Sequence, residues 1–293
     1  MAERINRAVE LLAQDQPIYY TGSHTGHVLT YEQGGKDVGT WADYINVGME
    51  HGAFDLAGLD TYLRGMVDGG PASSGHRTPA VIVEAPVEGA SEEIVRFNAW
   101  QFRQILGRGA HGVLLCQAES AAAVRVFVES CRYPVNRIGV GAGLGEGRRG
   151  VGSESSAGAI WGVERDEYLA KADPWPLNPE GELLLGLKIE SKAAIPKIEE
   201  ILAVPGIGFA EMGPGDLSLS LGYRRLPSPM PAEMQEVRER VKVACKANGV
   251  AFLEGARSEN VAAVIDGGAR VISGGNAETA QAGRAHTQRT MPV

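Results

Sequence analysis

The sequence predicts an α/β protein whose 293 residues form a single (β/α)8, or TIM, barrel domain. Eight short runs rich in Val, Ile and Leu recur along the chain, and they alternate with segments that carry apolar residues at helical spacing. Most runs are continuously apolar rather than alternating, which is typical of parallel strands covered on both faces. Eight strand–helix units in a chain of this length favour a closed barrel over the alternative, an open doubly wound sheet.

The expected elements follow one another in a regular order. Residues 1–16 predict an amphipathic helix, which carries acidic residues and lacks the long apolar core of a signal peptide. The expected strands then span residues 17–22, 42–48, 80–85, 112–117, 183–190, 206–212, 249–255 and 269–275. Helical spacing between strands is clear in 91–109, where Gly109 suits the end of a helix. Residues 276–293 are expected to form a C-terminal tail.

The segment 136–182 departs from this alternation. Its glycine-rich run GVGAGLGEG at 139–147 superficially resembles a dinucleotide-binding loop, but no convincing buried strand precedes it and no apolar helix follows it. Turn-forming residues then accumulate in ADPWPLNPEG at 172–181. We therefore expect 136–182 to be a lid over the barrel mouth, either mobile or completed by a partner subunit, or else an insertion loop.

The bulk composition disfavours several classes of partner. The net charge of −8 and the lack of a Lys/Arg run argue against binding to nucleic acid or to an anionic membrane. No run of about 18 apolar residues occurs, so no membrane span is expected. The three cysteines, Cys116, Cys131 and Cys245, show no CxxC spacing, which favours reduced thiols and a cytoplasmic location.

Acidic residues gather at the carboxyl ends of the expected strands, where a barrel builds its chemistry. Six of them stand at or near these ends: Glu50, Glu84, Glu119, Glu190, Asp216 and Glu254. Carboxylates crowded into a barrel mouth repel one another unless they are protonated or neutralised by a cation. Oxygen ligands without a matching cysteine cluster favour Mg²⁺ or Mn²⁺. The sequence therefore predicts a divalent-metal site.

Glu190 and Asp216 are the best candidates for the metal ligands, because they end two successive strands and are flanked by KIES and GPGDLS. Simpler interpretations stay open beside this one. Asp216 can cap the helix that follows it, and Glu119 or Glu254 can be solvated or paired with an arginine. Surface or hydrogen-bonded roles are equally open for the histidines near the strand ends: His24, His27 and His51.

The stretch LKIESKAAIPKIEEILAVPGIGFAEMGPGDLSLSLG at 187–222 resembles the core of the HpcH/HpaI aldolase/citrate lyase family, whose members are metal-dependent lyases on phosphoenolpyruvate/pyruvate-type barrels. Two further blocks agree with the family pattern. They are ADYINVGMEHG at 42–52 and GAHGVLLCQAESAAAVRVFVESCRYP at 109–134. The resemblance covers roughly residues 40–275 and is most specific at its centre.

The resemblance implies a role for several of these residues. Glu190 and Asp216 would be the two metal carboxylates, and His51 would assist proton transfer. Gly213 and Gly215 would let backbone N–H groups face a substrate carboxylate. We also place Gln117, at the end of the fourth expected strand, in the substrate-binding set. Family members commonly assemble into trimers or hexamers, so a homo-oligomer is implied.

Three departures from the family pattern bear on the reaction. Gly48 stands where the family carries an aspartate three residues before its histidine, and Cys116 replaces a proline. Glu84 replaces an arginine that contacts the reacting oxygen, and this reverses a charge. We therefore expect Glu84 to handle substrate directly, as an acid, a base or a hydrogen-bonding group. A salt bridge from Glu84 to Arg148 or Arg149 is the simpler alternative.

These observations lead to one main hypothesis and two alternatives. The main hypothesis is a divalent-metal-dependent carbon–carbon lyase of the aldolase type, which acts on a small oxo or hydroxy acid through a metal-stabilised enolate. One alternative is another metal-assisted reaction on the same scaffold, such as a hydrolysis or an isomerisation. The other alternative is a catalytically inactive barrel used for binding.

Overall fold

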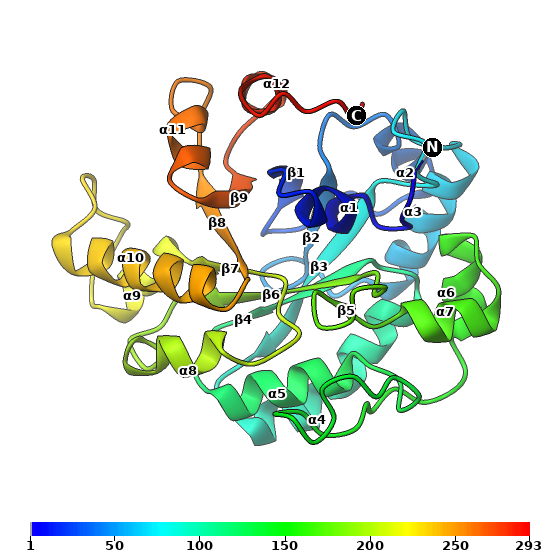
Figure 1. The fold of residues 1–293 in the computed structure, drawn as a ribbon, viewed down its shortest axis with the longest axis horizontal. Coiled ribbons are helices and arrows are strands. Elements are labelled where there is room, and N and C mark those ends of the chain that lie inside the picture. The colour runs from blue at the N-terminus through cyan, green and yellow to red at the C-terminus, as the bar shows by residue number, and fades with distance from the viewer. Residues whose placement is uncertain (1) are drawn as a thin grey trace.

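The computed structural model describes residues 2–293 and shows a closed barrel of parallel strands (Figure 1). Its eight strands are β1 Ile18–Ser23, β2 Tyr44–Gly48, β3 Ala80–Glu88, β4 Gly112–Cys116, β6 Leu183–Ile189, β7 Phe209–Met212, β8 Ala251–Gly255 and β9 Ala269–Ser273. Each pairs in parallel with its neighbour, and the pairs β4–β6 and β1–β9 close the ring. Every expected strand is confirmed. The two-residue strand β5 Pro174–Trp175, beside the start of β6, was not expected.

Helices alternate with the strands, and most of them surround the barrel, whereas α1 lies across one end of it (Figure 1). They are α1 Arg7–Ala13, α2 Tyr31–Asp37, α3 Leu56–Asp68, α4 Glu92–Gly107, α5 Ala121–Ser130, α6 Glu154–Trp161, α7 Arg165–Lys171, η1 Ile195–Lys197, α8 Ile198–Leu202, α9 Pro214–Ser220, α10 Ala232–Ala247, α11 Val261–Asp266 and α12 Ala277–His286. Ser91 caps α4 and Ser120 caps α5 through side-chain oxygens, as the serines before these helices favour. None of the helices in residues 2–293 has the length and apolar character needed to cross a bilayer.

The barrel interior is apolar toward the amino-terminal ends of the strands and polar toward their carboxyl ends. The apolar layer contains Ile18, Tyr44, Ile82, Leu114, Leu184, Phe209, Leu253 and Val271. Residues of α1 pack against this layer from the amino-terminal end, so the barrel is closed there. Because side chains alternate along a strand, the inward residues two positions further on from Tyr44, Ile82 and Phe209 are the polar Asn46, Glu84 and Glu211. The mouth of the barrel is therefore floored by polar side chains.

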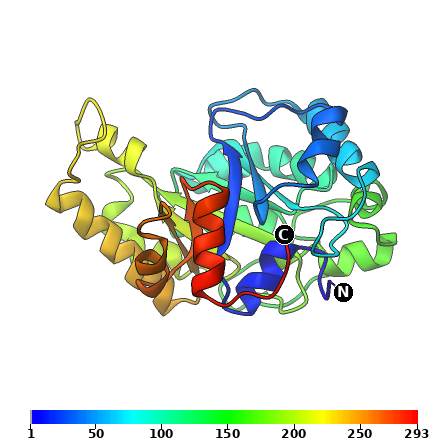
Figure 2. The ribbon, with the colours of Figure 1, turned by 90° about the horizontal axis from the view of Figure 1, so that it is seen from above.

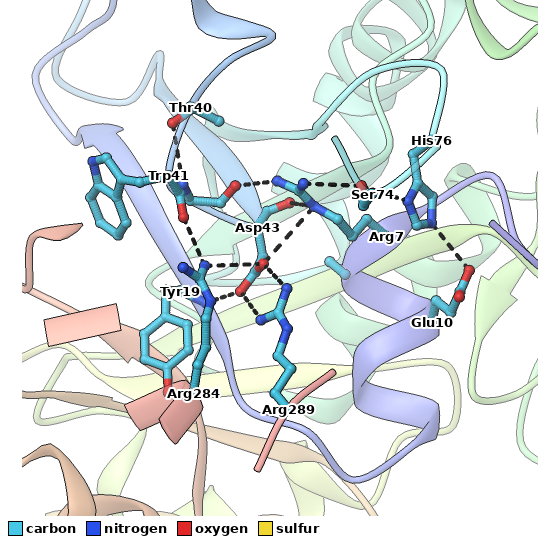
Figure 3. A network of polar contacts seen from close by, with 12 residues as sticks. Arg7, Glu10, Tyr19, Thr40, Trp41, Asp43, Ser74, His76, Arg284 and Arg289 are labelled. Atoms are coloured by element: carbon cyan, nitrogen blue, oxygen red, sulfur yellow. Dashed lines mark hydrogen bonds and ion pairs between the residues drawn. The ribbon is translucent and has the colours of Figure 1, made fainter. Parts of the chain in front are cut away.

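The C-terminal residues join the barrel instead of trailing from it. Residues 276–293 were expected as a tail, but they contain α12, which lies beside β1 (Figure 2). The buried carboxylate of Asp43 accepts hydrogen bonds from Arg289 at 2.9 and 2.6 Å, and Arg284 and Arg7 approach it as well (Figure 3). This cluster ties the C-terminal segment and α1 together near the start of β2.

The segment 136–182 does not cover the mouth of its own barrel, so the expectation of a mobile lid over that mouth is wrong. It begins after α5, a helix that runs from the carboxyl end of the barrel back to the amino-terminal end, and it leads to the start of β6. Both ends of the segment therefore lie at the amino-terminal end of the barrel. There the Trp161 ring stacks on His111 with centroids 5.6 Å apart, and a buried salt bridge joins Arg132 to Asp173. These contacts outweigh the glycine content that suggested a lid.

Candidate functional site

A buried lysine lies among the acids at the barrel mouth. Lys188, near the end of β6, has a side chain only 5% exposed. Its Nζ lies 3.2 Å from Glu50 Oε2 and 3.3 Å from Glu84 Oε2. Sequence reasoning missed this residue, although its position two before Glu190 places both side chains on the inner face of the strand. Part of the negative charge predicted for the mouth is thus neutralised by the chain itself.

Glu84 lies below the mouth surface with both oxygens engaged. Oε1 accepts a hydrogen bond from Asn46 Nδ2 at 2.9 Å and contacts His24 Nδ1 at 2.5 Å, while Oε2 faces Lys188. Burial works to raise the pKa of Glu84, but the hydrogen bond with His24 and the charge of Lys188 hold that pKa below its ordinary value. Glu84 is therefore a buried carboxylate that holds other side chains in place.

The alternative partners suggested for Glu84 lie elsewhere. Arg149 sits over the ring of Tyr133 with its guanidinium carbon 4.2 Å from the centroid, and its backbone N–H donates to Arg132. Both of these partners belong to the chain that follows α5, at the amino-terminal end of the barrel. The salt bridge from Glu84 to a loop arginine is not formed, because His24, Asn46 and Lys188 take that carboxylate instead.

His24 reaches Glu84 because two glycines leave room for it. A Cβ atom at Gly48 would lie 2.2 Å from the carbonyl oxygen of His24, and one at Gly22 would lie 2.0 Å from the carbonyl oxygen of Asn46. No side chain fits at either position, so the end of β1 packs closely on β2. The hydrogen bond with Glu84 raises the pKa of His24, whose ring is half exposed at the mouth.

His51 is held more loosely than His24. Its Nε2 lies 3.5 Å from Glu50 Oε2, which is beyond the usual length of a hydrogen bond. The same Glu50 oxygen faces Lys188, and the His51 side chain is 47% exposed. One lysine thus separates two histidine–carboxylate pairs, of which only the pair of His24 and Glu84 is in hydrogen-bond contact.

Glu190 is a buried carboxylate at the end of β6. Its Oε1 accepts a hydrogen bond from the backbone N–H of Gln117 at 2.8 Å, and Gln117 adopts a left-handed conformation with a φ of 48°. Burial raises the pKa of Glu190 to about 8, and the nearby charges of Glu211 and Glu50 add to this although Lys188 opposes it. Gln117 thus contacts this site through its backbone.

The turn from β7 to α9 packs directly on Glu190. A Cβ atom at Gly213 would lie 2.3 Å from Glu190 Oε2, so glycine is required there. The backbone N–H of Gly213 donates to the carbonyl of Ile189 at 3.1 Å, and it is therefore not the free donor that the sequence suggested. Asp216 lies half-buried in the first turn of α9, and Gly215 before it is exposed. Glu190 and the Asp216 turn are thus brought to neighbouring strand ends.

Two groups of side chains could bind a cation, and they differ in whether the chain itself already supplies a positive partner. Ligand atoms of Glu50, Glu84 and Cys116 lie within 4.8 Å of one another. However, the ammonium of Lys188 already pairs with both carboxylates, and burial keeps the pKa of the Cys116 thiol well above its ordinary value. In contrast, no Lys, Arg or His of residues 2–293 forms an ion pair with Glu190 or Asp216. The second group fits a divalent ion better, because a buried acid without a cationic partner is costly.

Glu211 is a further site residue that sequence reasoning missed. It is buried on β7, directly in register with Lys188 on β6. Burial raises its pKa, although the charge of Lys188 acts in the opposite direction. The signal was present as an acid inside an apolar run, but the partner could only be found from the pairing of the strands.

Comparison with known proteins identifies relatives of this chain. The family model HpcH/HpaI aldolase/citrate lyase matches residues 80–281. The hydroxypyruvate/pyruvate aldolase of Roseobacter denitrificans is 28% identical over 178 residues, which are 60% of this chain and 61% of that protein. The 2-keto-3-deoxy-L-rhamnonate aldolase of Salmonella gallinarum is 28% identical over 234 residues, which are 78% of this chain and 79% of that protein.

Solved structures support the fold. An HpcH/HpaI aldolase/citrate lyase family protein from Burkholderia cenocepacia superposes with a TM-score of 0.70 at 22% identity, covering 97% of both chains. An HpcH/HpaI aldolase from Desulfitobacterium hafniense gives a TM-score of 0.65 at 22% identity, covering 97% of this chain and 96% of its own. The predicted closed barrel is confirmed.

Proposed function

Because the chain belongs to the HpcH/HpaI aldolase/citrate lyase family, we propose that it is a divalent-metal-dependent carbon–carbon lyase of the aldolase type. The substrate class is a small 2-oxo or hydroxy acid, in keeping with the names of its relatives. The observation that carries the proposal is Glu190, a buried carboxylate that forms no ion pair with any Lys, Arg or His of residues 2–293, placed against the turn that presents Asp216. An ion at this place would stabilise the ionised form of Glu190, which burial disfavours.

Glu190 and Asp216 are the residues that would hold the ion, and their oxygen atoms suit Mg²⁺ or Mn²⁺. When bound, the ion would supply a Lewis acid that draws charge from the 2-oxo group of the substrate. The chain orients Glu190 through the Gln117 backbone N–H, which fixes one carboxylate oxygen. The other oxygen faces Gly213, where the lack of a side chain keeps the approach to α9 open.

The remaining roles follow from the contacts at the mouth. Lys188 supplies a fixed positive charge beside Glu190, since both side chains point inward from β6. Glu84 acts through its neighbours rather than on substrate, because both of its oxygens are taken. The backbone N–H of Gly215 lies in the first turn of α9 and has no intrahelical acceptor, so it can donate a hydrogen bond to a substrate carboxylate.

Metal binding by single variants tests the proposal. We expect the parent protein to bind one Mn²⁺ per chain, measured by titration calorimetry, and Asp216→Ala to bind it at least 10-fold more weakly. Glu119→Ala is the matched control, because Glu119 is another acid near a strand end and its carboxylate forms no ion pair with the described residues. Equal Mn²⁺ affinity in the parent protein and in Asp216→Ala would show that the assignment is wrong.

The assembly and location of the protein are proposals of a different kind. We infer a homo-oligomer, a trimer or hexamer as in the family, and the exposed apolar side chains of Ile94, Phe97 and Trp100 on α4 support a contact surface. The three cysteines are all buried and unpaired, which suits the reducing cytoplasm.

A further inference from the structure

We propose that His24, held by Glu84, is the acid–base residue of this site, in place of His51. The inference rests on the proposed function, since it names the group that moves the proton in that reaction. Its basis is a contact between two segments that lie far apart in the sequence. The ring of His24 leaves the end of β1, and its Nδ1 lies 2.5 Å from Oε1 of Glu84 on β3.

This contact fixes the tautomer of the imidazole. An ionised carboxylate only accepts hydrogen bonds, so His24 Nδ1 carries a proton and donates the hydrogen bond to Glu84 Oε1. The lone pair of the neutral ring is then on Nε2, on the side of the ring away from Glu84. His24 is 48% exposed, so its ring is accessible to a small molecule at the mouth. A histidine oriented by a buried carboxylate is the arrangement that general acid–base catalysis uses.

The surroundings keep Glu84 charged, which the arrangement requires. A buried carboxylate alone tends to take up a proton, but Lys188 Nζ at 3.3 Å and Asn46 Nδ2 at 2.9 Å stabilise the anion. The charged groups that act on His24 are Glu84, Lys188 and Glu211. Glu84 dominates because it alone is in hydrogen-bond contact with the ring. Glu84 is accordingly a positioning residue and His24 the catalytic one.

The backbone is also adapted to this pair. Gly48 gives space to the carbonyl group of His24, and any larger residue would overlap that group at 2.2 Å. Position 48 therefore cannot carry a side chain that orients His51 while His24 stays in place. Among residues 2–293, Glu50 is the one side chain that pairs with His51; that contact is 3.5 Å long, and Lys188 pairs with the same Glu50 oxygen.

The proposed step balances without a further reactant. Nε2 of neutral His24 accepts the proton of the substrate hydroxyl, and the O–H electron pair forms the new carbonyl double bond. The bond between the hydroxyl-bearing carbon and C3 of the 2-oxo acid breaks, and its electron pair remains on the 2-oxo acid half as an enolate. The imidazolium then returns the same proton to C3, which restores neutral His24 and releases a 2-oxo acid and an aldehyde.

Deuterium exchange into pyruvate tests the inference without the natural substrate. The parent protein with Mn²⁺ in D₂O is expected to exchange the methyl protons of pyruvate, followed by proton NMR, because the enolate can be formed from the product side. His24→Gln should lower the exchange rate about 100-fold or more, as loss of a general base does, while His51→Gln should change it less than about 5-fold. Both variants should bind Mn²⁺ like the parent protein.

The outcomes separate the two proposals. If the parent exchanges pyruvate and His24→Gln exchanges it at the same rate, the role of His24 is refuted while the lyase proposal stands. If the parent neither binds Mn²⁺ nor exchanges pyruvate, the proposed function fails and the inference falls with it. A loss of exchange in His51→Gln alone would assign the proton transfer to His51.

A pH profile distinguishes orientation from simple structural support. The exchange rate should rise with pH as His24 becomes neutral, and Glu84→Gln should move the midpoint of this rise to lower pH, because Glu84 raises the pKa of His24. The exchange rate at the plateau should also fall. A profile that keeps its midpoint in Glu84→Gln would show that Glu84 does not act through His24.

Discussion

Replacing Lys188 with methionine is the sharpest test of how the mouth is held together. The substitution keeps the length of the side chain and removes an ammonium that lies 3.2 Å from Glu50 and 3.3 Å from Glu84. At an effective dielectric constant of about 20, one such contact is worth about 5 kcal/mol before desolvation is subtracted. Removing one partner of a buried ion pair costs about 3–5 kcal/mol, because the other charge is left without a partner. We expect Lys188→Met to lose that much free energy of unfolding.

Urea unfolding followed by circular dichroism measures this loss, and a double-mutant cycle assigns it. Glu84→Gln in the Lys188→Met background removes the stranded charge, so the double variant should recover at least about 1 kcal/mol relative to the sum of the single losses. Lys192→Met is the matched control, because Lys192 is exposed on the same connection and should change stability by less than about 0.5 kcal/mol. A Lys188→Met protein as stable as the parent, or strictly additive losses, would show that Lys188 does not stabilise the fold through Glu84.

Two further predictions concern the opposite end of the barrel. Burial, with a contribution from His76, lowers the pKa of His111 to about 3. Below about pH 6.5 the unfolded chain therefore binds a proton at this histidine, whereas the folded chain does not. The free energy of unfolding thus falls with decreasing pH, by about 2 kcal/mol from this group at pH 5. His111→Gln should flatten the unfolding free energy between pH 7 and pH 5, and an unchanged slope would contradict this. Arg289→Met should lower the free energy of unfolding by about 2–4 kcal/mol, because Asp43 loses its bidentate partner, and it should expose the C-terminal segment to carboxypeptidase. Arg225→Met is the control: Arg225 is exposed and forms no ion pair with the described residues, so this change should alter neither stability nor digestion.

The barrel could be predicted because its signals are local. Each strand is a short apolar run, and the carboxyl end of a parallel strand is also the place where a barrel carries its chemistry. Glu190 and Asp216 were predicted as metal ligands in this way, since Glu190 directly follows β6 and Asp216 lies in the first turn of α9, just after β7. Those positions follow from the order of the residues alone.

The contacts inside the mouth could not be predicted in the same way. His24 directly follows β1 and Glu84 lies on β3, two strands that are separated by β2, and Lys188 contacts Glu84 from β6. Which polar side chains meet depends on strand register and on close approaches such as that at Gly48, and a single sequence states neither. Glu84 was therefore expected to face substrate, whereas its charge is used within the protein.

The mobile lid over the mouth was mispredicted because the expectation relied on the glycine content of the segment, and its packing cannot be seen in the sequence. The glycines of 139–158 indicated a flexible cover, but the anchors that follow them, Trp161 and Tyr168, are buried. Their partners, His111 and the carbonyl of Leu106, lie far away in sequence. Only the fold could show that this segment belongs to the amino-terminal end of the barrel.

Anomalous diffraction from crystals grown with Mn²⁺ shows directly which carboxylates bind the ion. We expect one strong manganese peak per chain, in contact with the carboxylates of both Glu190 and Asp216, and no peak among Glu50, Glu84 and Cys116, where Lys188 already supplies the positive charge. A manganese peak among Glu50, Glu84 and Cys116 with Lys188 displaced, or no peak beside Glu190 at saturating Mn²⁺, would show that Glu190 and Asp216 are not the metal ligands.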